Sequence, residues 1–443
     1  MARPRFSIVI PTRNRPETLE GTLRTCLAQT FEDFEIVVCD NCGDPRTRDV
    51  VRSASSSKIN YVRSDVALAM SDNWERALSQ AQGDFVTILG DDDGLLLHGL
   101  QEADERIRTM DLKVLVMAQV IYFWPGLEGT GIPANTLIVP RMHPRRVSRA
   151  RRMLQGAVYY LPNTPGLPSF YNSFVHRDIV PKLRAKTGKV FNGASPDWYS
   201  GLAIAALVDR YGTGGVPLRI AGGSRKGNGL ATLQGGSSQV ADEFVRLNMM
   251  SGLKWNPKVP NVPKSVSALA AECLQQVKEN LLPEDSDLRL DAKTLVDAIV
   301  FEIRHSAYPI SREEWTAYVQ ELETYVSRDE KIAKWFTAKF PRLAQSVPPT
   351  WVPPATQAFG LTDGGLKLDA SQFGVVDVYG AAELFERIFR RTSNSSTACD
   401  AVSPFDVWAA SCKELFHEVA PAVLVGALRV LRRRVGRVQR GVS

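Results

Sequence analysis

Residues 6–40, FSIVIPTRNRPETLEGTLRTCLAQTFEDFEIVVCD, decide the fold class. Two short runs rich in Val, Ile and Phe, Phe6–Ile10 and Phe34–Cys39, flank a stretch from 16 to 29 with helical spacing of its apolar residues. Pro16 suits the first turn of that helix, because proline fixes φ and has no N–H to leave unpaired. A strand, a helix and a strand in this order predict a parallel strand pair in an α/β sheet.

The alternation of strands and helices continues through the first 120 residues. Further strand-like runs lie at Ile59–Val62, Phe85–Leu89 and Val114–Val120, with helical stretches between them at about 45–54, 70–82 and 95–110. This order is typical of a doubly wound, largely parallel sheet flanked by helices. Residues 121–190 are rich in Pro and Gly and are predicted to be irregular.

The chain changes character after a glycine-rich stretch at 222–238. That stretch is predicted to be a mobile loop, with a passive linker as the alternative. One helix is expected before it, at about 197–209, and helices dominate after it, at 264–282, 291–307, 311–339, 378–392 and 406–420. We therefore divide the chain into an α/β domain (1–240), a mostly α-helical C-terminal domain (241–420) and a basic tail helix (421–443).

The tail carries the whole net charge of the chain. The formal net charge is +6, and residues 421–443 contain six arginines and no acidic residue. Without the tail, Lys and Arg fall from 54 to 48, which equals the number of Asp and Glu. The body is therefore neutral, and no nucleic-acid partner is expected. Helical spacing separates the apolar residues of the tail from its arginines, which predicts a helix lying on an anionic membrane; a helix packed on the protein is the alternative.

Composition indicates a globular protein, with 44% hydrophobic and 23% charged residues among 443. No apolar run reaches the roughly 20 residues that a membrane-spanning helix needs, and the N-terminus does not resemble a signal peptide. Six cysteines show no dense disulfide framework. We therefore expect a cytoplasmic location, with peripheral attachment to the inner face of the membrane through the tail.

Three polar clusters follow predicted strands at the point where each strand ends. Pro11–Arg15 follows the first strand, Asp40–Asn41 the second, and Gly90–Gly94, which reads GDDDG, the fourth. Ligands of open parallel sheets bind beyond the carboxyl ends of the strands. These clusters are therefore expected to meet along one edge of the sheet and to form a binding site there.

Three consecutive carboxylates, Asp91, Asp92 and Asp93, repel one another unless a cation lies between them. Hard oxygen ligands fit Mg²⁺ or Mn²⁺ bound together with phosphate groups of a substrate. The alternative is a solvated acidic turn in which Asp93 caps the next helix. The chain has no G-x-x-x-x-G-K-[ST] loop, and no G-x-G-x-x-G follows the first strand, which argues against P-loop hydrolases and dinucleotide-dependent oxidoreductases.

Three segments carry a family resemblance: residues 6–51, residues 71–96 (SDNWERALSQAQGDFVTILGDDDGLL) and residues 191–207 (FNGASPDWYSGLAIAAL). Their order and spacing resemble the family 2 inverting glycosyltransferases of the GT-A fold, over about residues 1–235. The resemblance implies transfer of a sugar from a metal-bound nucleotide-diphosphate donor to an acceptor hydroxyl, with Mn²⁺ or Mg²⁺ as cofactor. A saccharide or lipid-linked acceptor, in the synthesis of surface polysaccharide or glycoconjugates, is plausible by analogy.

The resemblance also implies roles for single residues. It places Pro11, Thr12 and Arg13 in the nucleoside and diphosphate pocket. Asp40 is expected to accept a hydrogen bond from the base, and Asn73 to brace the site, with a helix-surface Asn as the alternative. Asp91 and Asp92 are assigned to donor binding, and Asp92 and Asp93 are the leading direct metal ligands. The remaining assignment is Arg225, which with its neighbours is expected to close over the diphosphate.

Asp197 is the candidate general base, because inversion needs one carboxylate to take the proton of the acceptor hydroxyl. Its alternative role is to cap the helix that begins there. Two other classes remain open: a nucleotidyltransferase on a similar sheet, although the glycine-rich loop expected after the first strand is missing, and a non-catalytic nucleotide-sugar-binding scaffold. Metal-dependent hydrolysis of nucleotide sugars separates these classes.

Overall fold

The computed structural model describes residues 3–127, 132–160, 166–227, 238–285, 287–305, 310–345, 359–362 and 365–394. The predicted helix at 406–420, the tail at 421–443 and most of the glycine-rich loop lie outside these residues. Within the described part of the chain no helix is both long and apolar enough to cross a membrane.

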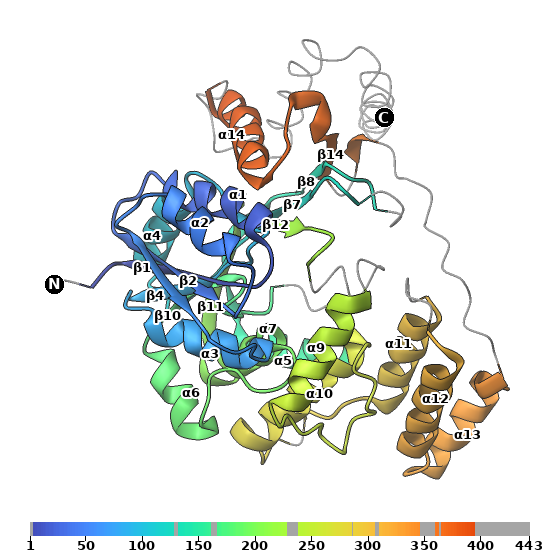
Figure 1. Cartoon of the computed structure of the whole chain (residues 1–443). Coiled ribbons are helices and arrows are strands. Elements are labelled where there is room, and N and C mark those ends of the chain that lie inside the picture. Colours follow the sequence, from blue (N-terminus) through green and yellow to red (C-terminus); the bar gives the residue numbers. More distant parts are fainter. Residues whose placement is uncertain are drawn as a thin grey trace, which may run out of the picture.

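The N-terminal half contains the predicted parallel sheet. Its first four strands lie in the order β3-β2-β1-β4 and are all parallel. In sequence order they are β1 (Phe6–Thr12), β2 (Phe34–Asp40), β3 (Ile59–Arg63) and β4 (Phe85–Ile88). The intervening helices are α1 (Pro16–Leu27), α2 (Arg46–Ser53), α3 (Met70–Gln80) and α4 (Gly99–Thr109). The predicted α/β fold is confirmed, and Figure 1 shows these helices beside the sheet.

Later parts of the chain complete the sheet with mixed strand directions. Antiparallel β10 (Ser173–His176) lies between β4 and β6 (Val114–Val116), and β11 (Arg210–Gly215) and edge strand β9 (His143–Arg149) follow. Residues 121–190 are therefore not irregular, and that prediction is wrong. The strands there are short, and β9 is exposed along most of its length, so it shows no apolar alternation.

A second sheet has the order β13-β14-β8-β7-β12-β5. Its strands are β5 (Gly94–Leu95), β7 (Gln119–Phe123), β8 (Thr136–Pro140), β12 (Arg219–Gly223), β13 (Gly360–Thr362) and β14 (Gly365–Asp369). The single strand predicted at Val114–Val120 is wrong, because β6 and β7 belong to different sheets. Both strands bury apolar side chains, so the sequence reads as one continuous run.

Helices dominate residues 238–345, as predicted. They are α9 (Ser238–Met250), α10 (Val266–Leu281), α11 (Ala292–Arg304), α12 (Arg312–Val326) and α13 (Glu330–Lys339), followed by a short 3-10 turn at Leu343–Gln345. The capping box at Ser311 and Glu314 is confirmed. One helix predicted over 311–339 is instead two, because the Asp329 carboxylate accepts from the backbone N–H groups of Lys331 and Ile332 and starts a new helix.

The last described segment returns to the N-terminal half. Strands β13 and β14 extend the second sheet, and a 3-10 turn (Ala370–Phe373) leads into α14 (Val378–Asn394), which packs on α1. Figure 1 shows α14 beside α1 and away from α10–α13. The packing therefore departs from the expected helical domain at 241–420, because the described residues 359–362 and 365–394 pack with the sheets.

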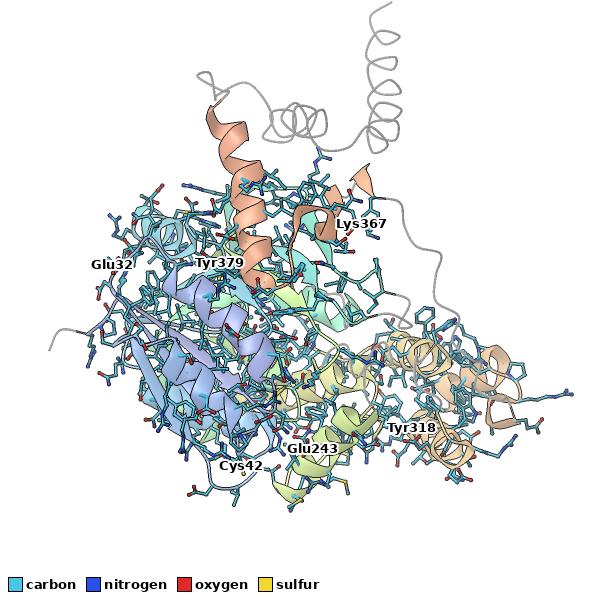
Figure 2. All side chains as sticks on the ribbon, turned by 45° about the horizontal axis from the view of Figure 1, so that its top comes forward. Glu32, Cys42, Glu243, Tyr318, Lys367 and Tyr379 are labelled. Atoms are coloured by element: carbon cyan, nitrogen blue, oxygen red, sulfur yellow. The ribbon has the colours of Figure 1, made fainter. Side chains whose placement is uncertain are left out.

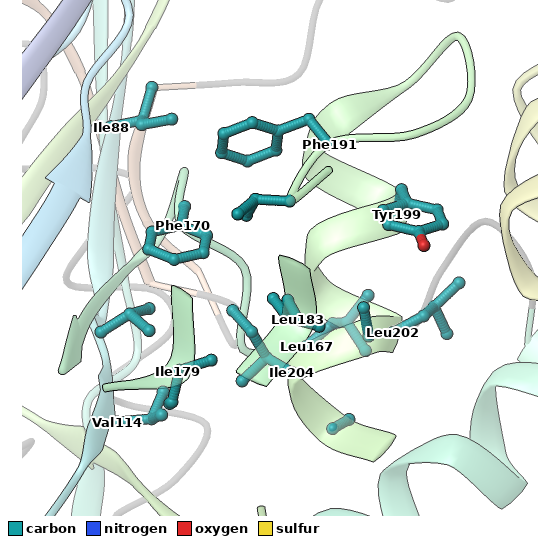
Figure 3. Packing of buried hydrophobic residues seen from close by; sticks show 14 of the residues in the cluster. Ile88, Val114, Leu167, Phe170, Ile179, Leu183, Phe191, Tyr199, Leu202 and Ile204 are labelled. Atoms are coloured by element: carbon teal, nitrogen blue, oxygen red, sulfur yellow. The ribbon is translucent and has the colours of Figure 1, made fainter. Parts of the chain in front are cut away.

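One buried cluster holds the helix that carries Asp197. Helix α7 (Pro196–Leu207) packs between α5 (Ala150–Tyr160) and α10, with α6 (Ile179–Thr187) nearby. Figure 3 shows its Tyr199, Leu202 and Ile204 among Phe170 and Phe191. Eight of the twelve residues of α7 are buried, which fixes the helix relative to its neighbours.

Candidate active site

A cleft of about 800 Å³ opens at the carboxyl ends of β1 and β4. The end of β12, the first turn of α7, and helices α3, α9 and α10 supply its other walls. Of the residues predicted from sequence, eight line it: Pro11, Thr12, Arg13, Asn73, Asp91, Asp92, Asp197 and Arg225. Two others, Asp40 and Asp93, lie behind the lining and not on it.

The Asp91 carboxylate is held by two residues that follow or end β1. Thr12 Oγ1 donates to Asp91 Oδ2 over 2.6 Å, and Arg15 Nη1 donates to Asp91 Oδ1 over 2.7 Å. Asp91 is 2% exposed and the Arg15 side chain 16%. These two hydrogen bonds fix the acidic turn, residues Gly90–Gly94, to the end of β1. They also place the Arg15 guanidinium in the lining of the cleft.

The Asp92 carboxylate faces the cleft with fewer partners. Ser224 Oγ donates to its Oδ2 over 2.5 Å, while Trp124 Nε1 donates to its backbone carbonyl over 2.8 Å. Among the described residues no donor reaches Oδ1. Burial, together with the neighbouring Asp93 and Asp91 charges and against the effect of Arg15, raises the pKa of Asp92 to about 7. A cation or a donor group in the cleft would relieve this cost.

Asp93 is committed to the protein interior. Arg219 Nη2 donates to its Oδ2 over 2.7 Å, and both side chains are fully buried. The backbone N–H of Gly222 donates to Oδ1 and that of Gly90 to Oδ2. Its carboxylate therefore joins β12 to the acidic turn, and the role of direct metal ligand that the sequence predicted for Asp93 has no support in this geometry.

Asp40 has a similar structural environment. Its Oδ2 accepts from Tyr61 and from Arg63, each over 2.8 Å, and its Oδ1 accepts from the backbone N–H of Gly43. It is fully buried. Direct recognition of a base by Asp40 would require these bonds to rearrange; its neighbour Asn41 lines the cleft instead.

Three further predicted residues lie at the cleft in different settings. Asn73 is buried on α3, where its Oδ1 accepts from Cys39 Sγ, so it is a lining residue and not a surface asparagine. Arg13 Nη2 donates to Glu243 Oε1 of α9 over 2.7 Å. Arg225 is exposed beside β12. These positions are compatible with contacts to a bound ligand.

Asp197 lies in the first turn of α7; the part of the cleft lining that α7, α9 and α10 supply is called the opposite wall. Ser195 is the N-cap residue, and its Oγ donates to Asp197 Oδ1 over 2.7 Å. No side-chain capping bond is formed at Ser195 itself. Burial raises the pKa of Asp197 above its ordinary value, although the Ser195 bond opposes the shift. A raised carboxylate pKa brings this group closer to the range of an effective general base.

The described residues include no group of three or more His, Cys, Asp or Glu side chains arranged to hold a metal ion. Mg²⁺, however, is often bound through one or two carboxylates plus substrate phosphates. Asp92 fits that pattern, since its buried carboxylate borders the cleft and its pKa is raised to about 7. The residues present thus suit a cation that arrives with a phosphate-bearing ligand.

Sequence reasoning missed the residues that hold the acidic turn. Arg219 lies 126 positions from Asp93 and gives no local signal. Its guanidinium also stacks over the Tyr171 ring, with its Cζ 4.6 Å from the ring centroid, and Tyr171 stacks on Trp74. Arg15 alone among them had a local sequence signal. It belongs to the Pro11–Arg15 cluster, which follows the first strand at the same sheet edge as the acidic turn.

Fold and site together define an α/β domain in which an acidic turn after β4 and the Asp197 carboxylate of α7 line one cleft. Residues 7–157 match the family described as Glycosyl transferase family 2. The resemblance seen in the sequence is thereby confirmed for this part of the chain.

Among curated relatives, the chain is 35% identical over 109 residues to the GalNAc(5)-diNAcBac-PP-undecaprenol beta-1,3-glucosyltransferase of Campylobacter jejuni, covering 23% of this chain and 35% of the relative. It is 31% identical over 175 residues to the Escherichia coli UDP-Glc:alpha-D-GlcNAc-diphosphoundecaprenol beta-1,3-glucosyltransferase WfgD, covering 39% and 65%. The chain thus spans between about a third and two thirds of these relatives. The crystal structure of Staphylococcus aureus TarS aligns with a TM-score of 0.46 at 15% identity, over 78% of this chain and 55% of that one.

Proposed function

We propose that this protein is an inverting glycosyltransferase that moves a sugar from a metal-bound nucleotide-diphosphate donor to an acceptor hydroxyl. The observation that carries the proposal is that Asp92, which follows β4, and Asp197, in the first turn of α7, line the same cleft, each with a raised pKa. One wall suits the charged donor, and the other suits removal of a proton from the acceptor.

The donor wall supplies both cationic and anionic groups. Pro11, Thr12 and Arg13 line the pocket for the nucleoside and the diphosphate, and Arg225 stands beside it. Asp92 would ligate Mn²⁺ or Mg²⁺ together with the donor phosphates; Asp91 supports that position through Thr12 and Arg15. When bound, such a cation stabilises the negative charge that builds on the departing diphosphate.

The acceptor wall supplies the base. The Asp197 carboxylate takes the proton of the acceptor hydroxyl while that oxygen forms a bond to the anomeric carbon. The bond from the anomeric carbon to the diphosphate oxygen breaks, and the nucleoside diphosphate leaves with the electron pair. Attack opposite the leaving group inverts the anomeric configuration. Ser195 holds Asp197 in place through its 2.7 Å hydrogen bond.

The acceptor is proposed to be a saccharide or a lipid-linked saccharide of surface polysaccharide or glycoconjugate synthesis. The names of the two relatives include an undecaprenol-linked acceptor. A peripheral position at the inner face of the membrane, through the basic residues 421–443, would bring the enzyme to such a substrate. Deleting 421–443 is expected to abolish sedimentation with anionic vesicles and to spare donor hydrolysis; unchanged sedimentation would refute the membrane role.

A donor panel tests the enzymatic proposal most directly. Purified protein is incubated with radiolabelled uridine, thymidine and guanosine diphosphate sugars, with Mn²⁺, with Mg²⁺ or with chelator. Release of free sugar that depends on the metal supports glycosyl transfer. A nucleotidyltransferase would instead release pyrophosphate from nucleoside triphosphates and sugar phosphates, and a scaffold would bind a donor without releasing any product.

A further inference from the structure

An ion pair joins the two walls of the cleft. Arg13 directly follows the end of β1, and Glu243 lies on α9, 230 positions later in the chain. Arg13 Nη2 and Glu243 Oε1 are 2.7 Å apart, and both residues line the cleft. Figure 2 labels Glu243 on α9, where this helix meets the N-terminal half. The pair therefore places a protein carboxylate against an arginine of the proposed donor site.

Glu243 differs from the other acidic side chains of the cleft. Asp91 and Asp92 belong to the donor wall, and Asp197 is held by Ser195. Glu243 contributes a negative charge from the helical half, and the other α9 residues that line the same cleft carry no charge: Gln239, Val240, Phe244 and Leu247. Its main partner is thus an arginine that the proposed donor site also needs.

A second cation is available to Glu243 on its own helix. Arg246 Nη2 lies 3.5 Å from the same Oε1 atom, one helical turn along α9. If an anionic ligand takes Arg13, Glu243 keeps Arg246 as a partner and is not left unpaired. Both Glu243 and Arg246 are partly exposed, with side chains 37% and 56% accessible, so the exchange does not bury a lone charge.

We infer that Glu243 is a displaceable counter-ion, which holds Arg13 in the empty cleft and competes with the diphosphate for it. The inference rests on the proposed function, since it assumes that a nucleoside diphosphate binds here. In the catalytic cycle, return of Glu243 to Arg13 promotes release of the nucleoside diphosphate product. Glu243 thereby sets how tightly the diphosphate, and not the nucleoside, is held.

The contrast between charged and uncharged ligands gives a sharp test. Affinities of nucleoside diphosphates and of the matching nucleosides are measured by calorimetry for the unmodified protein, for Glu243→Gln and for Asp242→Asn. Asp242 is the matched control, because it lies next to Glu243 on α9 but is 64% exposed and pairs with Lys264. Glu243→Gln should tighten diphosphate binding about twofold to fivefold, the range expected for loss of one competing, partly exposed ion pair.

The same substitution should leave nucleoside affinity unchanged, and Asp242→Asn should change neither. The gain should shrink at high salt, because screening weakens the competing pair, and it should vanish in an Arg13→Gln background. If the unmodified protein binds diphosphates but Glu243→Gln binds them equally or more weakly, the counter-ion inference is wrong and the proposed function stands. If no folded form binds any nucleoside diphosphate, the proposed function falls and takes this inference with it.

Discussion

The donor wall and the opposite wall of the cleft are built in different ways. The donor wall carries the carboxylates of Asp91 and Asp92, with Asp93 behind them; Arg15 fixes Asp91, and the buried Arg219 fixes Asp93. The opposite wall, on α7, α9 and α10, is mostly apolar and carries Asp197, whose pKa is raised by burial. Fixed charge suits binding of an anionic donor with its cation, whereas a carboxylate that has no ion-pair partner among the described residues and is held by the Ser195 hydroxyl suits proton transfer.

The largest expected effect concerns the opposite wall. Asp197→Asn removes the base without changing its shape and should reduce turnover by about 10³-fold or more, within the range for loss of general base catalysis. Donor affinity, measured by calorimetry, should stay nearly unchanged because the base acts on the acceptor. In the unmodified enzyme, activity should rise with pH through the raised pKa of Asp197, since only the ionised form accepts a proton.

Asp209→Asn serves as a control for this substitution, because Asp209 follows the other end of α7 and is exposed. It should retain normal turnover. A loss of donor affinity as steep as the loss of rate in Asp197→Asn would mean that Asp197 belongs to the donor wall, and the contrast between the two walls would then be wrong.

The next effect concerns the donor wall. Asp92→Asn should reduce transfer by at least about 100-fold, equivalent to a few kcal/mol of transition-state stabilisation, because the carboxylate charge that would hold the cation is lost. Its thermal stability should not fall, since the raised pKa shows that the charged form is unfavourable in the absence of a cation. Near-normal activity at limiting metal would contradict the assignment.

The neighbouring Asp93 should behave differently, although the sequence alone suggests the same outcome for both. Asp93→Asn leaves the buried Arg219 charge without its partner and should lower the free energy of unfolding by about 3–5 kcal/mol. Urea denaturation measures this loss. If instead the protein keeps its stability and loses only metal-dependent activity, Asp93 is a direct ligand and the structural role is refuted.

The smallest effect tests a second buried carboxylate behind the opposite wall. Glu272 of α10 is 1% exposed, and burial raises its pKa from 4.5 to about 7. The folded protein therefore holds this proton more tightly than the unfolded chain, so its stability falls as pH rises from about 4.5 to about 7. Glu272→Gln should raise the unfolding temperature at pH 8 by a few degrees and change it little at pH 4.5. An equal shift at both pH values would exclude titration of Glu272 as the cause.

The sequence predicted those parts of the fold and site that have a local signal. Strands β1, β2 and β4 are short apolar runs buried on both faces, and the acidic turn directly follows one of them. The partners of that turn could not be predicted, because Arg219 approaches Asp93 only once β12 has joined the second sheet. Strand β9 was missed for a related reason: its exposed arginines hide the pattern of an edge strand.

The order of the strands in space has a consequence for synthesis on the ribosome. Strand β10 separates β4 from β6, so the edge of β4 stays unpaired until residue 176 has emerged. At about 5–20 residues per second, the interval from residue 88 is roughly 4 to 18 s, during which a hydrophobic strand edge is open to wrong partners. The acidic turn is completed later still. Its partner Arg219 is translated after residue 176, and Val378, which packs against Gly94, is translated after Arg219. The part of the site that is translated early is thus completed late, and a nascent chain would gain most from a chaperone in that interval.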